Sequence, residues 1–487
     1  MRIPFVGPTY AGRSSNIDSS RCINFFPELG SPDSKSVSAL IGTFGTSLFC
    51  NAGTGPIRGT RPFNGGLFFV RGSSLYSVDI SGVVSPPLGT LSTSSGNVSM
   101  ADNGRGTIGN QLIIVDGASG YIYNVVTSTF TVISGGGWPG AADVVAFLDG
   151  YFIVNGSNSN SYFVSNLYDG TTWSGVATSP TSSSPDIIQS ILTINQQLIF
   201  VKQYNMEFWY DAGIPTSDGS PFQRIPGSVV DYGSTARWSV SCIGNSIFML
   251  GTQRNNNVGE FIGAIKIQGY SPEVISPPAI TYRLSQLTSL GDALSFSYAI
   301  EGHVFYVLTF PTGNATLVYD DTTKMWHEWS TYGGQTYSIG RHRSNTYAYF
   351  NGKHYVGDYA NGNIYELSSS VYDDYGSPIV SIRTSPCISD KDNLDNHFVH
   401  RINVDIESGA GSSSGDDPQS ALSWSDDGGH VWSNDYPASM GSIGQYLKRL
   451  IWRRLGYSRS RIFRLVMADK EKKVVISAGI EATKGTS

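Results

Sequence analysis

Paired carboxylates are the first residues in this sequence whose type and spacing could do chemistry. In glycoside hydrolysis one carboxylic acid protonates the leaving group while a second carboxylate acts on the other side of the scissile bond. Asp320-Asp321 and Asp373-Asp374 could mimic such a pair. Both lie at the ends of expected strands, where aspartate usually accepts hydrogen bonds from turn amides. We therefore predict that these pairs form turns and that the protein is not an enzyme.

Two histidines, His397 and His400, lie close to Asp392 and Asp395 and could bind a metal. A metal site needs three or four converging ligands that are held by further hydrogen bonds. This segment offers only a loop. The sequence also contains no GxxxxGK[ST] phosphate loop, no HExxH motif and no Cys-His ligand spacing. We predict neither a metal nor a cofactor.

The octapeptide SDDGGHVW at 425–432 matches the pattern SxDxGxxW and resembles the Asp-box of sialidase-type propellers. In such a hairpin turn the Asp and Ser side chains bind amides, the Gly takes a positive φ and the Trp packs back on the turn. A sialidase would carry several boxes and three converging arginines. Residues 1–375 contain few arginines and one remnant, YDGTTW at 168–173. We predict a purely structural turn formed by Ser425, Asp427, Gly429 and Trp432.

Positive charge is gathered near the end of the chain. The net charge is −6, but residues 445–473 hold ten basic and two acidic side chains, which leaves −14 for the rest. Arginine interleaved with aromatic residues is the composition of protein interaction hot spots. We predict a basic hairpin that docks on an acidic protein partner and does not form a DNA-binding groove. Its interface residues are Lys448, Arg449, Trp452, Arg453, Arg454, Arg459 and Arg461.

An internal repeat of about 48 residues is the strongest signal for the fold. Short apolar strands follow Gly, Asn or Asp turns, as in GGLFFVRG, GNQLIIVDG, DGYFIVNG and EGHVFYVL, and each is followed by an aromatic-rich strand. A repeat of this length with three or four strands is typical of a β-propeller blade. The seven copies predict a seven-bladed propeller over residues 50–375, although a long two-sheet sandwich with chance spacing is an alternative.

The repeat stops near residue 376, and six further strand-like segments follow. We predict that 376–487 form a separate antiparallel β-sandwich that contains the basic hairpin. In that hairpin Leu450 and Trp452 alternate with Arg449, Ile451 and Arg453, so one face is apolar and the other cationic. Arg454 breaks this alternation. Residues 1–49 contain several prolines and are expected to form an arm and one strand that helps to close the ring.

Composition excludes several other classes of protein. The 487 residues include 56 glycines, 12% aromatic and only 14% charged residues, which argues against disorder and against a coiled coil. No window approaches 18 consecutive apolar residues, so we expect no membrane span. The first residues lack the apolar core of a secretory signal. The sequence predicts an all-β protein with many short strands and tight turns.

Both ends of the chain resemble the packaged-DNA stabilisation proteins, or tail hub proteins, of short-tailed phages. The opening IPFVGPTYAGRSSNIDSSRCINFFPE is similar to the start of many phage proteins. The ending resembles that family in a Lys-Arg-x-x-Trp-Arg-Arg-x-Gly segment. Its positions are Lys448, Arg449, Trp452, Arg453, Arg454 and Gly456.

This resemblance implies a structural virion protein, the tail hub or nozzle, made in the host cytoplasm. Six copies would form a ring below the head-to-tail adaptor, extend the channel, retain packaged DNA and carry tail fibres, spikes or a needle. Double-stranded DNA would pass through the lumen without specific binding, in keeping with an acidic body, because cationic contacts would hold the phosphates. The alternative is a propeller-type glycan-binding adhesin or a sialidase-like glycosidase or depolymerase.

Overall fold

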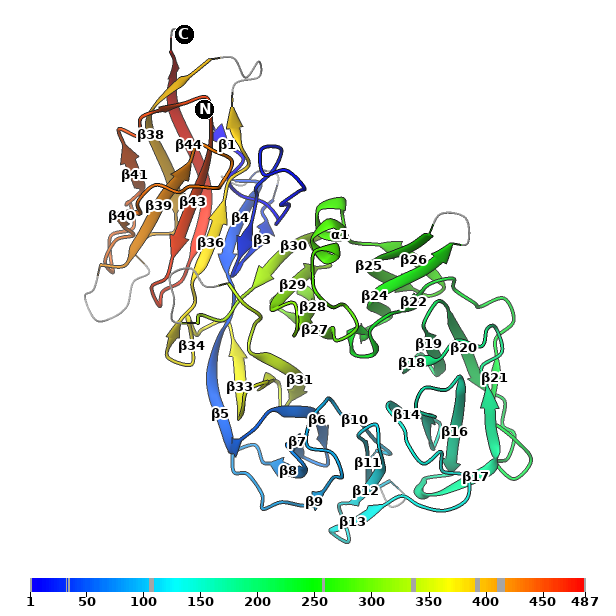
Figure 1. Ribbon diagram of the computed structural model, residues 1–487. Coiled ribbons are helices and arrows are strands. Elements are labelled where there is room, and N and C mark those ends of the chain that lie inside the picture. Colours follow the sequence, from blue (N-terminus) through cyan, green and yellow to red (C-terminus); the bar gives the residue numbers. More distant parts are fainter. Residues whose placement is uncertain are drawn as a thin grey trace.

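The computed structural model describes residues 2–31, 33, 36–104, 109–255, 259–333, 339–389, 395–409 and 417–485. Within these residues the only helical elements are α1 (Pro278–Ser285) and a short 3-10 turn, η1 (Arg237–Ser239). All other regular elements are strands, which confirms the predicted all-β class. Figure 1 shows a ring of small sheets with a second body beside it, and both chain ends lie in that second body.

The ring consists of successive groups of antiparallel strands, and in most of the groups spatial neighbours are also consecutive in sequence. The first four groups have four strands each. They are β6–β9 (Ile57–Phe63, Gly66–Arg71, Ser74–Val78, Gly89–Thr90), β10–β13 (Ser99–Asp102, Gln111–Val115, Gly120–Asn124, Thr129–Val132), β14–β17 (Val145–Leu148, Tyr151–Asn155, Ser161–Asn166, Asp169–Pro180) and β18–β21 (Ile188–Ile194, Gln197–Lys202, Met206–Asp211, Phe222–Arg224).

The remaining groups complete the ring. The fifth is β22–β26 (Gly233–Ser234, Ser241–Ile243, Ser246–Asn255, Gly259–Gln268, Ser271–Val274), and the sixth is β27–β30 (Leu294–Ile300, His303–Phe310, Ala315–Asp320, Met325–Trp329). The last is β31–β33 (Ser344–Phe350, Lys353–Asp358, Asn361–Ser368) together with β5 (Gly45–Thr54). Because β5 pairs with β33, a strand from the start of the chain closes the ring. The described strands of the ring thus form seven groups.

Turn chemistry explains why the repeat is visible in the sequence. The hairpins between the first two strands of several groups contain two successive residues with positive φ, as at Asn64-Gly65 (47° and 80°) and Asp149-Gly150 (48° and 91°). This is the type I′ turn, whose twist matches that of paired strands. The strand that follows is buried on both faces, and every residue from Leu112 to Val115 is completely inaccessible. Such strands therefore show no polar alternation.

The second body is a sandwich of two sheets. The first sheet has the order β3 (Phe25–Leu29), β4 (Ser38–Gly42), β44 (Val474–Lys484), β38 (His397–Ile406) and β41 (Leu450–Arg453), with β1 (Arg2–Ile3) on β44 and β42 (Tyr457–Ser458) on β38. The second sheet contains β36 (Ser381–Thr384), β43 (Ser460–Met467), β39 (Gln419–Ser425) and β40 (Tyr436–Ser439), with β37 (Ile388–Ser389) on β43. Side chains such as Ile402 and Phe463 fill the space between the sheets.

One sheet runs from the ring into the sandwich. The short strand β2 (Cys22–Ile23) pairs in parallel with β30 of the ring and antiparallel with β36 of the sandwich. A small hairpin, β34 (Asp373–Asp374) and β35 (Ser377–Pro378), lies next to β5 between the two bodies. The first 49 residues therefore give strands to the sandwich, bridge the two bodies through β2, and begin the strand that closes the ring.

Candidate assembly surface

The predicted Asp-box is a compact turn between β39 and β40. The Ser425 hydroxyl accepts the Gly429 N–H at 2.8 Å and donates to Asp427 Oδ1 at 2.7 Å. Asp427 in turn accepts the amides of His430 and Val431 at 2.9–3.0 Å. These hydrogen bonds hold the pKa of Asp427 below its usual value. The carboxylate thus serves the backbone of its own turn.

The box also contacts other parts of the chain. The Trp432 indole donates to the Gly429 carbonyl at 3.1 Å, and the Arg464 guanidinium lies 4.2 Å from the centre of the indole ring. A Cβ added to Gly428 would come within 2.5 Å of the Asn16 amide oxygen. The N-terminal arm therefore passes directly against this turn. The remnant at 168–173 repeats the indole contact, because Trp173 donates to the Gly170 carbonyl at 2.8 Å.

The basic segment does not form the predicted hairpin. Both β41 and β42 pair with β38, in the registers Arg401 with Arg453 and Phe398 with Tyr457. They are therefore two parts of one interrupted strand at the edge of the first sheet. The burial pattern of β41 alternates as predicted, since Leu450 and Trp452 are buried whereas Ile451 and Arg453 are exposed. The hairpin prediction is wrong because the chain crosses to β43 in the other sheet after β42.

Arg454 departs from the alternation because the strand is interrupted there. Its φ is 58°, in the left-handed region that non-glycine residues rarely adopt. The amides of Arg454 and Leu455 still donate to carbonyls of β38, at 2.9 and 3.1 Å. This bulge turns Arg454 outward and lets Leu455 occupy the core position that follows Trp452.

Two of the predicted interface cations, Arg461 and Lys448, have partners within the chain. Arg461 is only 3% exposed, and its guanidinium donates two hydrogen bonds to Asp426 at 2.6 and 2.7 Å and one to the Leu455 carbonyl. Arg461 therefore holds the Asp-box turn on the sheet and is not available to a partner. The Lys448 amine bonds to the Ser439 hydroxyl and lies 3.8 Å from Asp417. Trp452 is buried and donates its indole N–H to the Tyr436 carbonyl at 2.8 Å.

The other predicted arginines are exposed and carry no partner among the described residues. We call them the arginine cluster: Arg449, Arg453, Arg454 and Arg459. Large apolar side chains on the same edge of the sandwich are exposed as well, namely Tyr446, Leu447, Ile451 and Tyr457. Arginine together with exposed aromatic and aliphatic side chains is the composition of a protein-docking surface. The basic and apolar parts of the prediction thus meet at the edge of the sandwich formed by β41 and β42, and Arg459 in addition lines a cavity beside β44.

The lysines at the end of the basic segment hold the joint between the two bodies. The Lys470 and Lys473 amines donate to the carbonyls of Gly376 and Ile379, each at 2.6 Å, and Lys472 pairs with Glu407 at 2.9 Å. Burial lowers the pKa of Lys473 to about 8. Part of the positive charge that marks this segment in the sequence therefore has a structural use within the chain.

The paired carboxylates lie apart from one another and bind separate partners. Asp320 bonds to the His303 ring at 2.7 Å, whereas Asp321 forms ion pairs with Lys266 and Lys324 at 2.8 and 2.6 Å. In the second pair, Asp374 binds Arg343 at 2.9 Å and Asp373 lies 3.6 Å from Lys470. Each carboxylate thus has a structural partner, as their position at strand ends predicts.

The histidine segment does not assemble a ligand set in the part of the chain that can be described. His400 bonds through Nε2 to the Thr483 hydroxyl at 2.8 Å, and Asp395 pairs with Lys484. Asp392 lies outside the described residues. Across the described ranges no group of three or more His, Cys, Asp or Glu side chains is placed to hold a metal ion.

A repeated polar pair in the ring escaped the sequence analysis. In several groups the apolar second strand ends at a polar side chain, which bonds to a side chain on the third strand. In each case the bonded residue on the third strand pairs in register with a residue on the second strand, and that residue precedes the polar one by two positions. The pairs therefore share one geometry. The pairs are Arg71–Tyr76 at 2.5 Å, Asp116–Tyr121 at 3.1 Å, Lys202–Glu207 at 2.7 Å and Asp358–Tyr365 at 3.2 Å.

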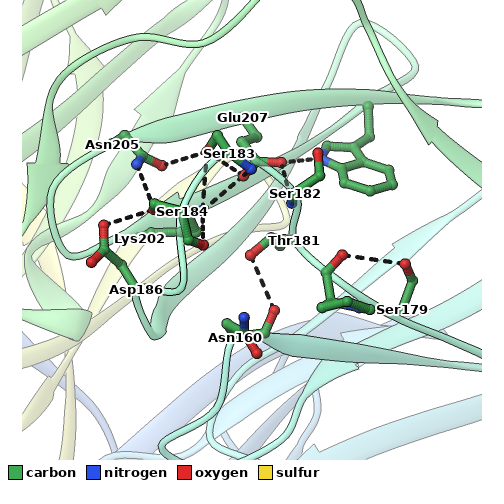
Figure 2. Close-up of polar contacts among 12 residues, drawn as sticks. Asn160, Ser179, Thr181, Ser182, Ser183, Ser184, Asp186, Lys202, Asn205 and Glu207 are labelled. Atoms are coloured by element: carbon green, nitrogen blue, oxygen red, sulfur yellow. Dashed lines mark hydrogen bonds and ion pairs between the residues drawn. The ribbon is translucent and has the colours of Figure 1, made fainter.

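The Lys202–Glu207 pair is completely buried and organises the connection between two groups (Figure 2). Glu207 accepts the amides of Ser182 and Ser183 at 3.3 and 2.9 Å, and the Lys202 amine donates to the Ser184 carbonyl at 2.9 Å. Burial alone would raise the pKa of Glu207, but the hydrogen bonds from Lys202 and Ser183 outweigh it and lower the pKa. A polar residue directly after an apolar run, as in LIIVD and LIFVK, is the sequence signal for these pairs.

A second missed cluster lies where the arm, the ring and α1 meet. Glu328 on β30 is buried and accepts hydrogen bonds or ion pairs from Arg21 of the arm and Arg283 of α1 at 2.6 and 2.8 Å. Arg383 on β36 is also buried and donates to the carbonyls of Phe5, Gly7 and Pro8 at 2.6–3.0 Å. These contacts fix the arm and the sandwich to the ring. They join residues too distant in sequence for any spacing pattern to reveal.

No described helix is long and apolar enough to cross a lipid bilayer.

No curated protein matches the chain. Solved structures that match the chain include a computationally designed protein, Ika8 (TM-score 0.36, 7% identity, 66% of this chain and 99% of the other). Another is the extracellular domain of a putative hybrid two-component system from B. thetaiotaomicron (TM-score 0.43, 9% identity, 76% of this chain and 44% of the other). A third is the Pan2 WD40 domain of Neurospora crassa (TM-score 0.42, 9% identity, 65% of this chain and 90% of the other).

Family comparison identifies both bodies. Residues 1–372 match the family described as "Bacteriophage P22 Gp10, beta-propeller", and residues 387–483 match "Bacteriophage P22 Gp10, beta-sandwich". The two matches follow one another in the order of the ring and the sandwich in the structure. The predicted propeller followed by a sandwich is therefore confirmed, and the chain belongs to the bacteriophage P22 Gp10 family of phage tail hub, or DNA stabilisation, proteins.

Proposed function

We propose that this protein is a non-enzymatic component of the phage tail, located in the virion. It forms a homohexameric ring below the head-to-tail adaptor, extends the DNA channel, retains the packaged genome and anchors fibres, spikes or a needle. Membership of a phage structural family supports this proposal. So does the charge distribution, because an acidic body allows DNA to slide past without being held through its phosphates.

The arginine cluster is the observation that carries the proposal. Four unpaired cations beside exposed aromatic and aliphatic side chains form a surface suited to an acidic protein partner. The sandwich that presents this surface is joined to the ring by β2 and by the Glu328 cluster. Because the sandwich is fixed to the ring, a partner that binds this surface would hold the whole ring in place. We assign the adaptor as the partner of this surface.

A head-attachment assay tests the assignment. Arg453→Glu combined with Arg454→Glu should leave the fold intact, because both side chains are exposed, and should block attachment to adaptor-bearing heads. The matched control reverses two exposed propeller lysines, Lys324→Glu and Lys353→Glu, and should attach normally. Normal attachment by the arginine variant would refute the assignment. So would tight binding of duplex DNA by the wild type at physiological salt.

The proposal also predicts how the isolated protein behaves. The charged fraction is low, and the one α-helix among the described residues spans only eight residues, so no long helical seam is present there to hold copies together. The free chain should therefore be a weakly associating monomer. Light scattering at micromolar concentration should give the mass of one chain. A stable dimer or tetramer under these conditions would contradict a ring that forms only in the particle.

A further inference from the structure

A cleft of about 620 Å³ lies between the N-terminal arm and α1, and we call it the arm cleft. The arm contributes Tyr10, Gly12 and Arg13 to its walls, α1 contributes Tyr282, and β25 of the ring contributes Phe261. Three segments that are far apart in the sequence therefore form one cleft. None of these residues belongs to the arginine cluster or to the sandwich.

Contacts within the chain hold the two main walls of the arm cleft in place. Arg21, which follows the cleft residues of the arm, and Arg283 of α1 both bind the buried carboxylate of Glu328, at 2.6 and 2.8 Å. The arm itself folds back on a backbone hydrogen bond from the Tyr10 amide to the Ser20 carbonyl, at 2.8 Å. Because both walls are anchored in this way, a ligand would not have to order them when it binds.

The arm cleft is lined mainly by aromatic side chains that are only partly covered. Tyr10 keeps 38% of its surface exposed, and Phe261 and Tyr282 are half-buried. Aromatic side chains around a concave site, together with a few polar groups, are the usual lining of a binding site. An apolar or aromatic side chain that entered the cleft would remove these three rings from water.

Arg13 gives the arm cleft an unpaired positive charge. Its guanidinium is exposed, lies 5.4 Å from the centre of the Tyr282 ring, and forms no hydrogen bond or ion pair with a described residue. Stacking on a ring leaves the N–H groups of a guanidinium free to donate.

The other polar groups of the arm cleft favour the same kind of ligand. The hydroxyls of Tyr10 and Tyr282 have no hydrogen-bond partner among the described residues. No carboxylate is found among the described residues that line the cleft. Free donors around one cation, without an anion of the chain to bind them, favour a ligand that carries a negative charge.

We propose that the arm cleft binds a short acidic segment of a partner protein, which places an apolar or aromatic side chain between the arm and α1 and a carboxylate against Arg13. Single-stranded DNA also combines rings with negative charge, but proteins bind it in grooves that follow its backbone with several positive charges. Arg13 is the one cation among the described residues that line this cleft, and one cation matches one carboxylate. The site requires neither the hexamer nor the adaptor.

The test uses the full chain and three fluorescein-labelled peptides of the same length. The first places phenylalanine and leucine between aspartates, the second carries lysine in place of aspartate, and the third carries serine in place of the apolar residues. The first peptide should bind saturably by fluorescence anisotropy and more weakly as the salt concentration rises. The second and third should each bind about tenfold more weakly, because each lacks one half of the recognition.

Three results would overturn the proposal. The first is that the acidic apolar peptide does not bind. The second is that either of the other two peptides binds as tightly as it does. The third is that oligothymidylate of similar length binds more tightly than the acidic apolar peptide, which would assign the cleft to single-stranded DNA.

A charge variant locates the bound carboxylate. Arg13→Gln removes the positive charge from a side chain that forms no hydrogen bond with a described residue, and it should weaken binding of the first peptide by about tenfold. Arg254→Gln is the matched control, because Arg254 is exposed and also lies 5.4 Å from the centre of a tyrosine ring but does not line the cleft. This control should bind as the wild type does. Equal losses in the two variants would refute a specific contact with Arg13.

A filling variant locates the bound apolar side chain. A Cβ added to Gly12 would meet no atom within 4 Å, and Gly12 does not have a positive φ, so Gly12→Trp should obstruct the cleft without straining the arm. Gly136, in the loop after β13, has the same two properties away from the cleft, and Gly136→Trp is the control. The first variant should lose about tenfold in affinity, and the control should lose none. Normal binding by Gly12→Trp would show that the peptide binds elsewhere. These outcomes are independent of the head-attachment assay.

Discussion

The Arg21 guanidinium donates two hydrogen bonds to Glu328, at 3.1 and 2.6 Å, across 307 positions of sequence. Arg283 of α1 reaches the same carboxylate at 2.8 Å. One buried carboxylate therefore joins the N-terminal arm, the ring and the only α-helix among the described residues. Removal of this charge should therefore destabilise the joint between the arm, the ring and α1.

Replacing that carboxylate should loosen the joint. Glu328→Gln leaves two arginines without their anion in a largely buried site, and such a loss costs about 3 kcal/mol of unfolding free energy. Chemical unfolding monitored by fluorescence should show the loss. Glu366→Gln, which disturbs an exposed ion pair with Lys353, is the control and should change stability by less than about 1 kcal/mol. If both variants lose the same unfolding free energy, the buried cluster stabilises the protein no more than an exposed ion pair does.

The same residue predicts a pH dependence. Burial raises the pKa of Glu328, but the charges of Arg21 and Arg283 outweigh burial, so the pKa is lowered in the folded protein. A carboxyl with a lowered folded pKa contributes stability above its unfolded pKa, and this contribution is lost as the pH falls toward the folded value. Unfolding midpoints of the wild type should therefore decline below about pH 4.3 more steeply than those of Glu328→Gln. Parallel curves would exclude this role.

The buried Lys202–Glu207 pair makes a separate prediction about the ring. Lys202→Met leaves Glu207 buried without its cation and should cost about 3–5 kcal/mol, whereas Lys202→Met with Glu207→Gln removes both charges and should cost less. Thermal unfolding of the two variants gives the comparison. A double variant that is less stable than the single one would show that the serine contacts of Glu207 matter more than its charge balance.

The Asp-box should prove structural when it is mutated. Trp432 is half-buried, so Trp432→Ala should cost about 2 kcal/mol, roughly half the loss for a fully buried tryptophan. Asp427→Ala should destabilise the turn by freeing the amides of His430 and Val431. Neither variant should alter any turnover of sialosides or capsular polysaccharide. Cleavage that is present in the wild type and absent in Asp427→Ala would reverse this assignment.

Sequence patterns predicted those features that depend on neighbours along the chain. Turns such as Asn64-Gly65 and the apolar runs after them revealed the blades, because both signals are local. The Asp-box turn was found for the same reason. The arginine cluster was only partly predicted, since burial decides which cations face solvent. Arg461 lies two residues after the exposed Arg459, yet it is buried and binds Asp426.

Features that depend on pairing between distant segments could not be predicted. The strands β41 and β42 are separated by a short stretch with Gly456, which is the pattern of a hairpin, but both pair with β38. Their pairing partner, β38, lies about 50 residues earlier in the chain, and no local sequence signal indicates this pairing. The Glu328 cluster arises in the same way, because Arg21 of the arm meets Arg283 and Glu328, which lie more than 250 residues later in the chain.

Arg454 gives a last prediction that separates stability from docking. Its φ of 58° is strained for arginine and costless for glycine. Arg454→Gly should therefore raise the unfolding free energy by about 0.5–1 kcal/mol while it weakens attachment to heads, because one exposed cation is lost. Arg453→Gly, at an ordinary strand position in β41, should weaken attachment to a similar extent but lower stability. If Arg454→Gly is both less stable and fully competent to attach, the bulge serves packing and Arg454 is no part of the docking surface.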